Sequence, residues 1–259
     1  MTLDGKTILI TGSTDGVGRV VAKRLAAAGA RVLVHGRDLE RGRSLVAEIE
    51  AGGRGEAVNS SEESLDVLIN NAGIGSGGAS GQRATSHDGF ELRFAVNYLA
   101  GFLLTHLLMP KILASKPSRI VNVASLGQAP LDFEDVMINR GYSGSRAYSQ
   151  SKLAQIMFTI DLAEALTREG VTVNSLHPAT YMNTTMVRQS GTTPISSVEE
   201  GADAILNLVL SPAFEGRGGL FLDRLRETRA SAQAYDAAAR DKLRALSRRL
   251  TGLDAEEGN

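Results

Sequence analysis

The segment YSQSK, residues 148–152, places a tyrosine and a lysine four positions apart. If the segment is helical, Tyr148 and Lys152 lie one above the other on the same face, with their Cβ atoms about 5 to 6 Å apart. The pair is then either an ordinary surface contact or a phenol placed to transfer protons. These five residues alone favour the first alternative, because tyrosine and lysine meet at this spacing by chance in many helices.

A glycine-rich segment, TGSTDGVG (residues 11–18), follows a short apolar run and opens a helix-period segment. Glycines in this position allow a tight turn, a close approach of the backbone to a pyrophosphate, and close packing of helix on strand. The phosphate then meets the free N–H groups of the helix start. The alternative is a plain glycine-rich turn. The predicted cofactor-binding residues here are Gly12, Ser13, Asp15, Gly16, Val17 and Gly18.

The segment HGRD, residues 35–38, follows the second apolar run. In dinucleotide-binding folds an acidic side chain near this strand end binds the ribose hydroxyls, whereas an arginine accommodates a 2′-phosphate. The guanidinium fork of Arg37 suits a phosphate. We therefore expect NADP as the cofactor, with NAD less favoured; the alternative is that Arg37 is a solvated residue at a helix start.

Short apolar runs alternate with longer helix-period segments along the chain. Strands are expected at residues 6–11, 30–36, 65–73, 118–125 and 171–178, and helices at 18–29, 38–53, 90–114 and 146–169. Strands with almost no polar alternation indicate a parallel sheet covered on both faces. The chain, residues 1–259, is thus predicted to be α/β, a single doubly wound, Rossmann-like dinucleotide-binding domain. A substrate loop at 179–195 and a C-terminal helix at 230–250 complete it.

The composition excludes several classes of protein. Of the 259 residues 42% are hydrophobic, and the formal net charge is −1, so we expect neither a nucleic-acid partner nor a membrane surface. The chain has no cysteine and four scattered histidines, and no metal site is expected. It shows no secretory signal and no run of the roughly 18 apolar residues of a membrane span. A cytoplasmic protein is predicted.

Five motifs occur in an order that is typical of one family: TGSTDGVG, NNAG (70–73), VNVAS (121–125), YSQSK and NSLHP (174–178). Over roughly residues 5–210 the chain resembles the short-chain dehydrogenase/reductase family. The stretches ELRFAVNYLAGFLLT and AYSQSKLAQIMFTIDLA resemble its retinol-dehydrogenase-like branch. The resemblance implies a catalytic tetrad of Asn97, Ser125, Tyr148 and Lys152. It also implies cofactor contacts by Asn71, Ala72, Gly73, Tyr148, Lys152 and Pro178.

The tetrad has a chemical rationale of its own. Reduction of a carbonyl needs a hydride on carbon and a proton on oxygen, and a free phenol with a pKa of about 10 is poorly matched to neutral pH. The positive charges of Lys152 and of an oxidised nicotinamide would favour the phenolate. Tyr148 can then act as acid in reduction and base in oxidation, while Ser125 holds the substrate oxygen. For Asn97 the resemblance implies an ordered water in a proton path to Lys152.

The predicted function is that of an NADP-preferring oxidoreductase that interconverts an alcohol and a carbonyl on an apolar small molecule. The loop at 179–195 mixes Tyr181, Met182 and Met186 with threonines, which indicates a partly apolar pocket. The alternative is a catalytically impaired nucleotide-binding protein of the same fold, whose tetrad survives while a shortened region prevents productive binding.

Three departures from the family pattern stand out: an insertion at 130–146, Ala179 after Pro178 in place of glycine, and a short connection at 56–68. A parallel crossover normally needs a dozen or more residues, and the six residues 59–64 span at most about 20 Å. We expect residues 53–64 to be irregular, with the third strand and the following crossover helix shortened or missing. A rival explanation is that the sequence joins two segments across absent residues. A homo-oligomer or a neighbouring loop would shield the exposed edge.

Overall fold

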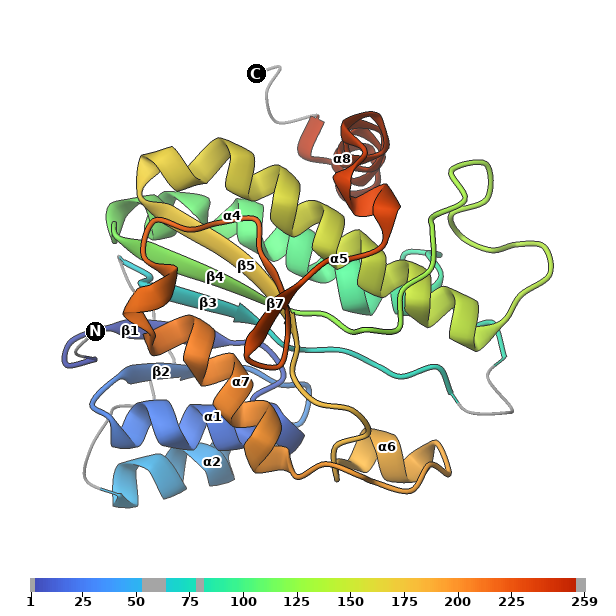
Figure 1. The fold of residues 1–259 in the computed structure, drawn as a ribbon. Coiled ribbons are helices and arrows are strands. Elements are labelled where there is room, and N and C mark those ends of the chain that lie inside the picture. Colours follow the sequence, from blue (N-terminus) through green and yellow to red (C-terminus); the bar gives the residue numbers. More distant parts are fainter. Residues whose placement is uncertain (1–2, 53–63, 78–81, 255–259) are drawn as a thin grey trace.

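The computed structural model describes residues 3–52, 64–77 and 82–254, which build one seven-stranded sheet in the order β2-β1-β3-β4-β5-β6-β7 (Figure 1). The strands are β1 (Thr7–Ile10), β2 (Arg31–Val34), β3 (Val67–Asn70), β4 (Ser118–Val123), β5 (Val171–His177), β6 (Phe221–Asp223) and β7 (Arg226–Thr228). The first six are parallel, as predicted. Strand β7 is antiparallel to β6, because a two-residue connection can join only antiparallel strands.

Helices cover both faces of the sheet, which confirms the doubly wound prediction (Figure 1). One layer holds α1 (Gly16–Ala27), α2 (Leu39–Ala51) and α7 (Val198–Leu210), and the other holds α4 (Ala100–Ala114) and α5 (Gly144–Leu166). Helix α8 (Ala237–Thr251) packs against α5. The short elements are α3 (Leu92–Phe94), η2 (Ala95–Leu99), η3 (Thr167–Glu169), α6 (Thr185–Gln189), η4 (Pro212–Phe214) and η5 (Ala232–Tyr235).

Side-chain caps fix where the long helices begin. Asp15, Asp38, Ser143, Ser197 and Asp236 each accept a hydrogen bond from a backbone N–H of the first turn of α1, α2, α5, α7 and α8 respectively. Such caps satisfy N–H groups that have no partner inside the helix. Because α1 and α5 start at the carboxyl edge of the sheet, their caps also fix the segments that carry the predicted site.

The connection after α2 is short. Helix α2 ends at Ala51 and β3 begins at Val67, and β2 pairs only with β1 among the residues that the structure describes. The described part of the chain therefore contains no strand beyond β2, in agreement with the predicted loss of the third strand. The prediction that residues 53–64 are irregular falls, except for Ser64, outside the described residues.

The helical stretch Leu92–Ala114 is long and apolar enough to span a membrane by length and composition alone, with 39% of its most apolar window buried. In the fold it forms α3, η2 and α4 and packs on α5 and β3. Phe102 and Ile112 are fully buried, whereas Leu107 is exposed. A core helix of a globular domain passes the same test.

Candidate active site

Many of the predicted site residues directly follow one of four neighbouring strands. The glycine-rich segment follows β1, Asn71 follows β3, Ser125 follows β4 and Pro178 follows β5. These strands are adjacent and parallel in the sheet, so their carboxyl ends meet at one edge, where open α/β sheets bind ligands. The fold thus brings together residues that are far apart in the sequence.

The turn after β1 is built on contacts too close for any side chain. A Cβ on Gly12, where φ is +67°, would lie 2.9 Å from Cα of Ala72, and one on Gly18 would lie 2.4 Å from the carbonyl oxygen of Gly12. Asn71 Nδ2 donates to the carbonyl oxygens of Thr11 (2.9 Å) and Gly12 (3.2 Å). A close backbone approach held by an amide fits a cradle for a pyrophosphate at the start of α1.

Two of the predicted cofactor residues shape this turn. Asp15 accepts from the N–H of Gly16 at 2.7 Å. The Ser13 hydroxyl accepts from the N–H of His35 at 2.9 Å and donates to its carbonyl oxygen at 3.3 Å. Ser13 is fully buried, so it ties the turn to the end of β2, and direct contact with a cofactor stays a prediction for it.

Arg37 is exposed at the end of β2 and makes no hydrogen bond or ion pair with another described residue. Sequence reasoning missed Arg41, one turn further along. Its guanidinium lies 3.4 Å from a carboxylate oxygen of Asp15 and 3.3 Å from one of Asp38. The spacing of four residues at a helix start was the available signal. Two arginines therefore lie next to the glycine-rich turn.

Tyr148 and Lys152 share one face of α5, with Lys152 Nζ 5.8 Å from the centre of the phenol ring. Lys152 is 5% exposed. Its Nζ donates to the carbonyl oxygen of Val123 at 2.9 Å and to Oε1 of Gln155 at 2.8 Å. Both partners are neutral, so burial lowers the pKa of Lys152 to about 7. Sequence reasoning missed Gln155, although it lies one turn after the lysine.

Burial has the largest influence on Tyr148 and raises the pKa of the phenol, while a hydrogen bond with Ser125 lowers it. The prediction that Lys152 and an oxidised nicotinamide together favour the phenolate stays a prediction. In the structure the Nζ of Lys152 is directed to Val123 and Gln155. Burial disfavours the charged phenolate relative to the neutral phenol.

Ser125 is close to the phenol. A Cβ placed on Gly127 would lie 3.5 Å from both Ser125 Oγ and Cε1 of Tyr148. Ser125 Oγ also accepts from the N–H of Gly127 at 3.0 Å. The absence of a side chain on Gly127 leaves the space between the two hydroxyl-bearing residues open.

Asn97 lies in η2, a single π-helical turn between α3 and α4, and such turns are frequent at functional sites. Its amide accepts from the N–H of Ile74 (2.7 Å) and donates to the carbonyl oxygen of Ile74 (3.1 Å) and to Ser151 Oγ (2.9 Å). A Cβ on Gly73 would lie 3.2 Å from Asn97 Oδ1 and 3.6 Å from Lys152 Nζ. Asn97 and Lys152 thus flank Gly73, while the predicted water path stays a prediction.

A buried ionic group that the sequence did not reveal holds the loop after β3. Arg93 donates to the carbonyl oxygens of Gly75 (3.0 Å) and Ser76 (2.7 Å) and to the Tyr142 hydroxyl (2.6 Å). That hydroxyl donates to Glu91 at 2.9 Å. Burial, together with the Glu91 hydrogen bond, raises the pKa of Tyr142 to about 12. The group joins this loop to the segment that leads into α5.

The predicted substrate loop contains the short helix α6. Tyr181, Met186 and Ile195 are exposed in the loop, and the backbone carbonyl oxygen of Tyr181 accepts from the N–H of Ile195 at 3.0 Å. A Cβ on Gly75 would lie 3.3 Å from Met186, so the loop contacts the segment after β3. Within the described parts of the chain, no group of three or more His, Asp or Glu side chains could hold a metal ion.

The family model for short chain dehydrogenases matches residues 6–62 and 55–194. Human retinol dehydrogenase 13 is 34% identical over 296 positions, covering 98% of this chain and 87% of that protein. Human retinol dehydrogenase 11 is 34% identical over 282 positions, covering 97% and 87%. A crystal structure of an uncharacterised protein from Mycobacterium paratuberculosis superposes with a TM-score of 0.80 at 29% identity, covering 97% of this chain and 95% of that one.

The alignment with retinol dehydrogenase 13 is longer than the chain itself, 296 positions against 259 residues. The relative therefore has residues inside the matched span that lack a counterpart here. The family model matches in two pieces, and these overlap at residues 55–62, in the connection after α2. Motifs, fold, site geometry and relatives agree, and the chain belongs to the short-chain dehydrogenase family of oxidoreductases, with its relatives in the retinol-dehydrogenase-like branch.

Proposed function

We propose that this protein is an NADP-preferring oxidoreductase that interconverts an alcohol and a carbonyl on an apolar small molecule, with Tyr148 as the general acid and base. The observation that carries the proposal is the arrangement of Tyr148, Ser125 and the buried Lys152 at the carboxyl edge of the sheet, beside the glycine cradle. NADPH, when bound, supplies the hydride.

In the direction of reduction the substrate oxygen accepts hydrogen bonds from Ser125 and Tyr148. Since burial raises the pKa of Tyr148, the phenol arrives protonated and donates its proton as negative charge develops on that oxygen. Burial lowers the pKa of Lys152 to about 7, so this side chain can take up or release a proton close to physiological pH. The carbonyl oxygen of Val123 and the amide of Gln155 keep its Nζ in place.

The preference for NADP rests on two arginines. Arg37 has no partner among the described residues, and Arg41 is directed toward the glycine-rich turn by Asp15. A guanidinium is the side chain best suited to a phosphate dianion. Asp38, which could serve ribose hydroxyls, instead caps α2 by accepting from the N–H of Arg41 at 3.1 Å.

The substrate class rests on the apolar rim of the site. Leu126, Tyr181, Met186 and Ile195 are all exposed large hydrophobic residues on the loops after β4 and β5. Exposed apolar side chains that gather at a site edge are typical of a surface that binds an apolar ligand. The names of the relatives, retinol dehydrogenases, support the same class of alcohol.

The alternative is a catalytically impaired nucleotide-binding protein, and the shortened connection after α2 is the observation that favours it. A titration of NADPH fluorescence combined with a panel of apolar aldehydes, ketones and alcohols separates the two. Turnover of a panel member, with a higher kcat/KM for NADPH than for NADH, is expected. Tight NADPH binding without turnover of any member would favour the alternative. Cytoplasmic location stays a prediction.

A further inference from the structure

The C-terminal segment of the chain is bonded to the loop that carries Ser125. Gln128 Nε2 donates to the carbonyl oxygen of Ser125 at 3.0 Å, and Gln128 Oε1 accepts from the N–H of Ser231 at 2.8 Å. One amide therefore connects the backbone of the predicted catalytic serine to a residue 106 positions further along the chain. A glutamine side chain can do this because it carries both donors and acceptors.

A second amide, from the C-terminal segment, binds the same loop at Leu131, three residues after Gln128. Gln233, in η5, accepts from the N–H of Leu131 at 2.7 Å and donates to the carbonyl oxygen of Leu131 at 3.1 Å. The two bonds hold the loop as a neighbouring strand would. Leu131 is 4% exposed and belongs to the same apolar cluster as Ala234 and Leu243. Buried apolar contacts therefore accompany the two hydrogen bonds between Gln233 and Leu131.

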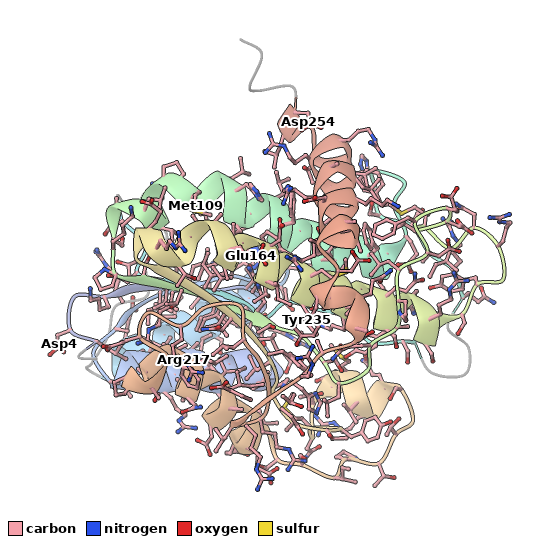
Figure 2. All side chains as sticks on the ribbon, turned by 45° about the horizontal axis from the view of Figure 1, so that its top comes forward. Asp4, Met109, Glu164, Arg217, Tyr235 and Asp254 are labelled. Atoms are coloured by element: carbon pink, nitrogen blue, oxygen red, sulfur yellow. The ribbon has the colours of Figure 1, made fainter. Side chains whose placement is uncertain are left out.

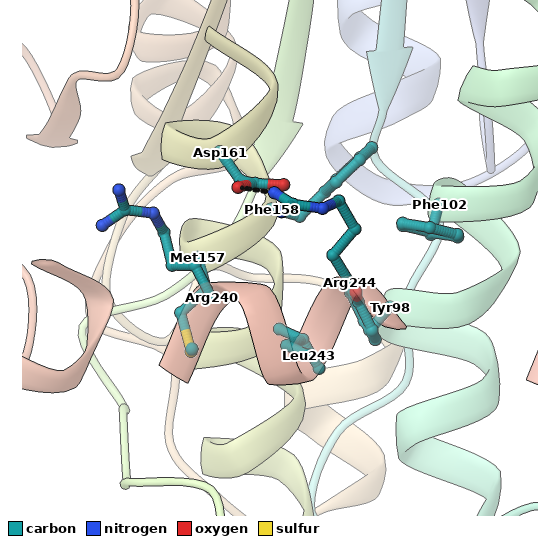
Figure 3. Close-up of a pocket in the computed structure, with 8 residues that line it drawn as sticks. All are labelled: Tyr98, Phe102, Met157, Phe158, Asp161, Arg240, Leu243 and Arg244. Atoms are coloured by element: carbon teal, nitrogen blue, oxygen red, sulfur yellow. Dashed lines mark hydrogen bonds and ion pairs between the residues drawn. The ribbon is translucent and has the colours of Figure 1, made fainter. Parts of the chain in front are cut away.

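Helix α8 attaches this segment to α5, which carries Tyr148 and Lys152, and to η2, which carries Asn97. Arg240 and Arg244 pair with Glu164 and Asp161 of α5, and Glu164 is labelled in Figure 2. The hydroxyl of Ser247 lies 2.6 Å from that of Tyr98, which is next to Asn97. Figure 3 draws Arg240, Leu243 and Arg244 of α8 together with the side chains of α5 and η2 that they adjoin. These residues line a cavity of about 10 Å³, room for one water at most.

We infer that residues 230–251 are a brace for the active site, and that Gln128 and Gln233 are positioning residues that fix Ser125 opposite Tyr148. The inference rests on the proposed function in one respect, the role of Ser125 in holding the substrate oxygen. The loop is also bonded to α5, through the N–H of Ala129, which donates to the carbonyl oxygen of Ser149 at 3.2 Å. Without the two glutamines the loop loses its side-chain bonds to the C-terminal segment, and small displacements of reacting groups cost large factors in rate.

The test uses Gln128→Met and Gln233→Ala in the full-length protein. Both variants should lower kcat on the order of tenfold, with the KM for NADPH nearly unchanged, because the glycine cradle is untouched. Asn174→Ala is the matched control. The Asn174 amide likewise bonds to the backbone of another segment. It donates to the carbonyl oxygen of Arg217 (2.8 Å) and accepts from the N–H of Leu220 (3.0 Å), and neither residue belongs to the Ser125 loop.

Hydrogen exchange of the peptide covering residues 124–131 is the readout that does not depend on activity. We expect faster exchange in Gln233→Ala than in the wild type and in Asn174→Ala. The double variant should lose little more kcat than the worse single variant, because both act through Ser125. Unchanged exchange of this peptide in Gln233→Ala, or an unchanged kcat in Gln128→Met, would overturn the inference. If the wild type turned over no carbonyl substrate, the proposed function would fail, and the exchange measurement would still decide on the brace.

Discussion

Replacing Lys152 with methionine should change how the stability of the protein depends on pH. Burial lowers the pKa of Lys152 from 10.5 to about 7. Between these two pH values the lysine is protonated in the unfolded chain and mostly neutral in the folded protein. Since the unfolded chain then binds more protons, the free energy of unfolding of the wild type rises with pH.

The rise amounts to as much as about 1.4 kcal/mol per pH unit, or roughly 4 kcal/mol over three units. Methionine cannot titrate, so the variant lacks this rise. It also leaves the carbonyl oxygen of Val123 and Oε1 of Gln155 without their donor, at a cost of about 1 to 3 kcal/mol for each. That cost is the same at every pH, so it shifts the curve without changing its slope.

Urea unfolding between about pH 7 and pH 10 measures the slope. The free energies of the wild type and of Lys152→Met should diverge with rising pH, in favour of the wild type. Lys23→Met is the control, because the Lys23 side chain is 51% exposed and should give a curve parallel to the wild type. Parallel curves for Lys152→Met as well would refute the claim that this lysine is neutral in the folded protein near pH 8.

We predict the effects of three further substitutions and the intact mass of the protein. Arg37→Ala should lower the preference for NADPH over NADH, as the ratio of kcat/KM values, by about tenfold or more, because a charge-assisted contact contributes about 1.5 to 3 kcal/mol; an unchanged ratio would exclude its role. Gly18→Ala should abolish NADPH binding in a fluorescence titration, since the new Cβ would lie 2.4 Å from a backbone oxygen, and wild-type affinity would contradict the cradle. Tyr142→Phe should lower the free energy of unfolding, measured with urea, by about 1 to 3 kcal/mol, because Arg93 and Glu91 lose their hydrogen bonds with the Tyr142 hydroxyl. An unchanged free energy of unfolding would show that these two bonds do not stabilise the fold. The intact mass should be near 27.4 kDa; a protein heavier by a strand and a helix would mean that the connection after α2 is not short.

The sequence predicted the parts of the fold that local patterns encode. The apolar runs of β1 and β4, the helix predicted at 18–29, which the structure begins at Gly16, and the glycines that follow β1 are each visible within about ten residues. Strands β6 and β7 have three residues each, too few to show a period, so they were not predicted. The four tetrad residues came from motif order, and the structure places all of them at one edge of the sheet.

What could not be predicted depends on contacts between distant segments. The bonds from Arg93 to the loop after β3 and from Gln233 to Leu131 exist only once the chain has folded. The burial of Tyr148 is a feature of the same kind. The sequence shows a lysine four residues after the tyrosine, whereas the desolvation that raises the pKa of the phenol is a property of the packed protein.

The role of Tyr148 is tested most directly by Tyr148→Phe, which keeps the ring and removes the transferable proton. Turnover of an accepted carbonyl substrate with NADPH, followed under single-turnover conditions, should fall by at least about 100-fold. The dissociation constant of NADPH, measured by fluorescence on the same preparation, should be nearly unchanged. A phenylalanine variant that reduces the substrate at close to the wild-type rate would contradict the assignment of Tyr148 as the general acid.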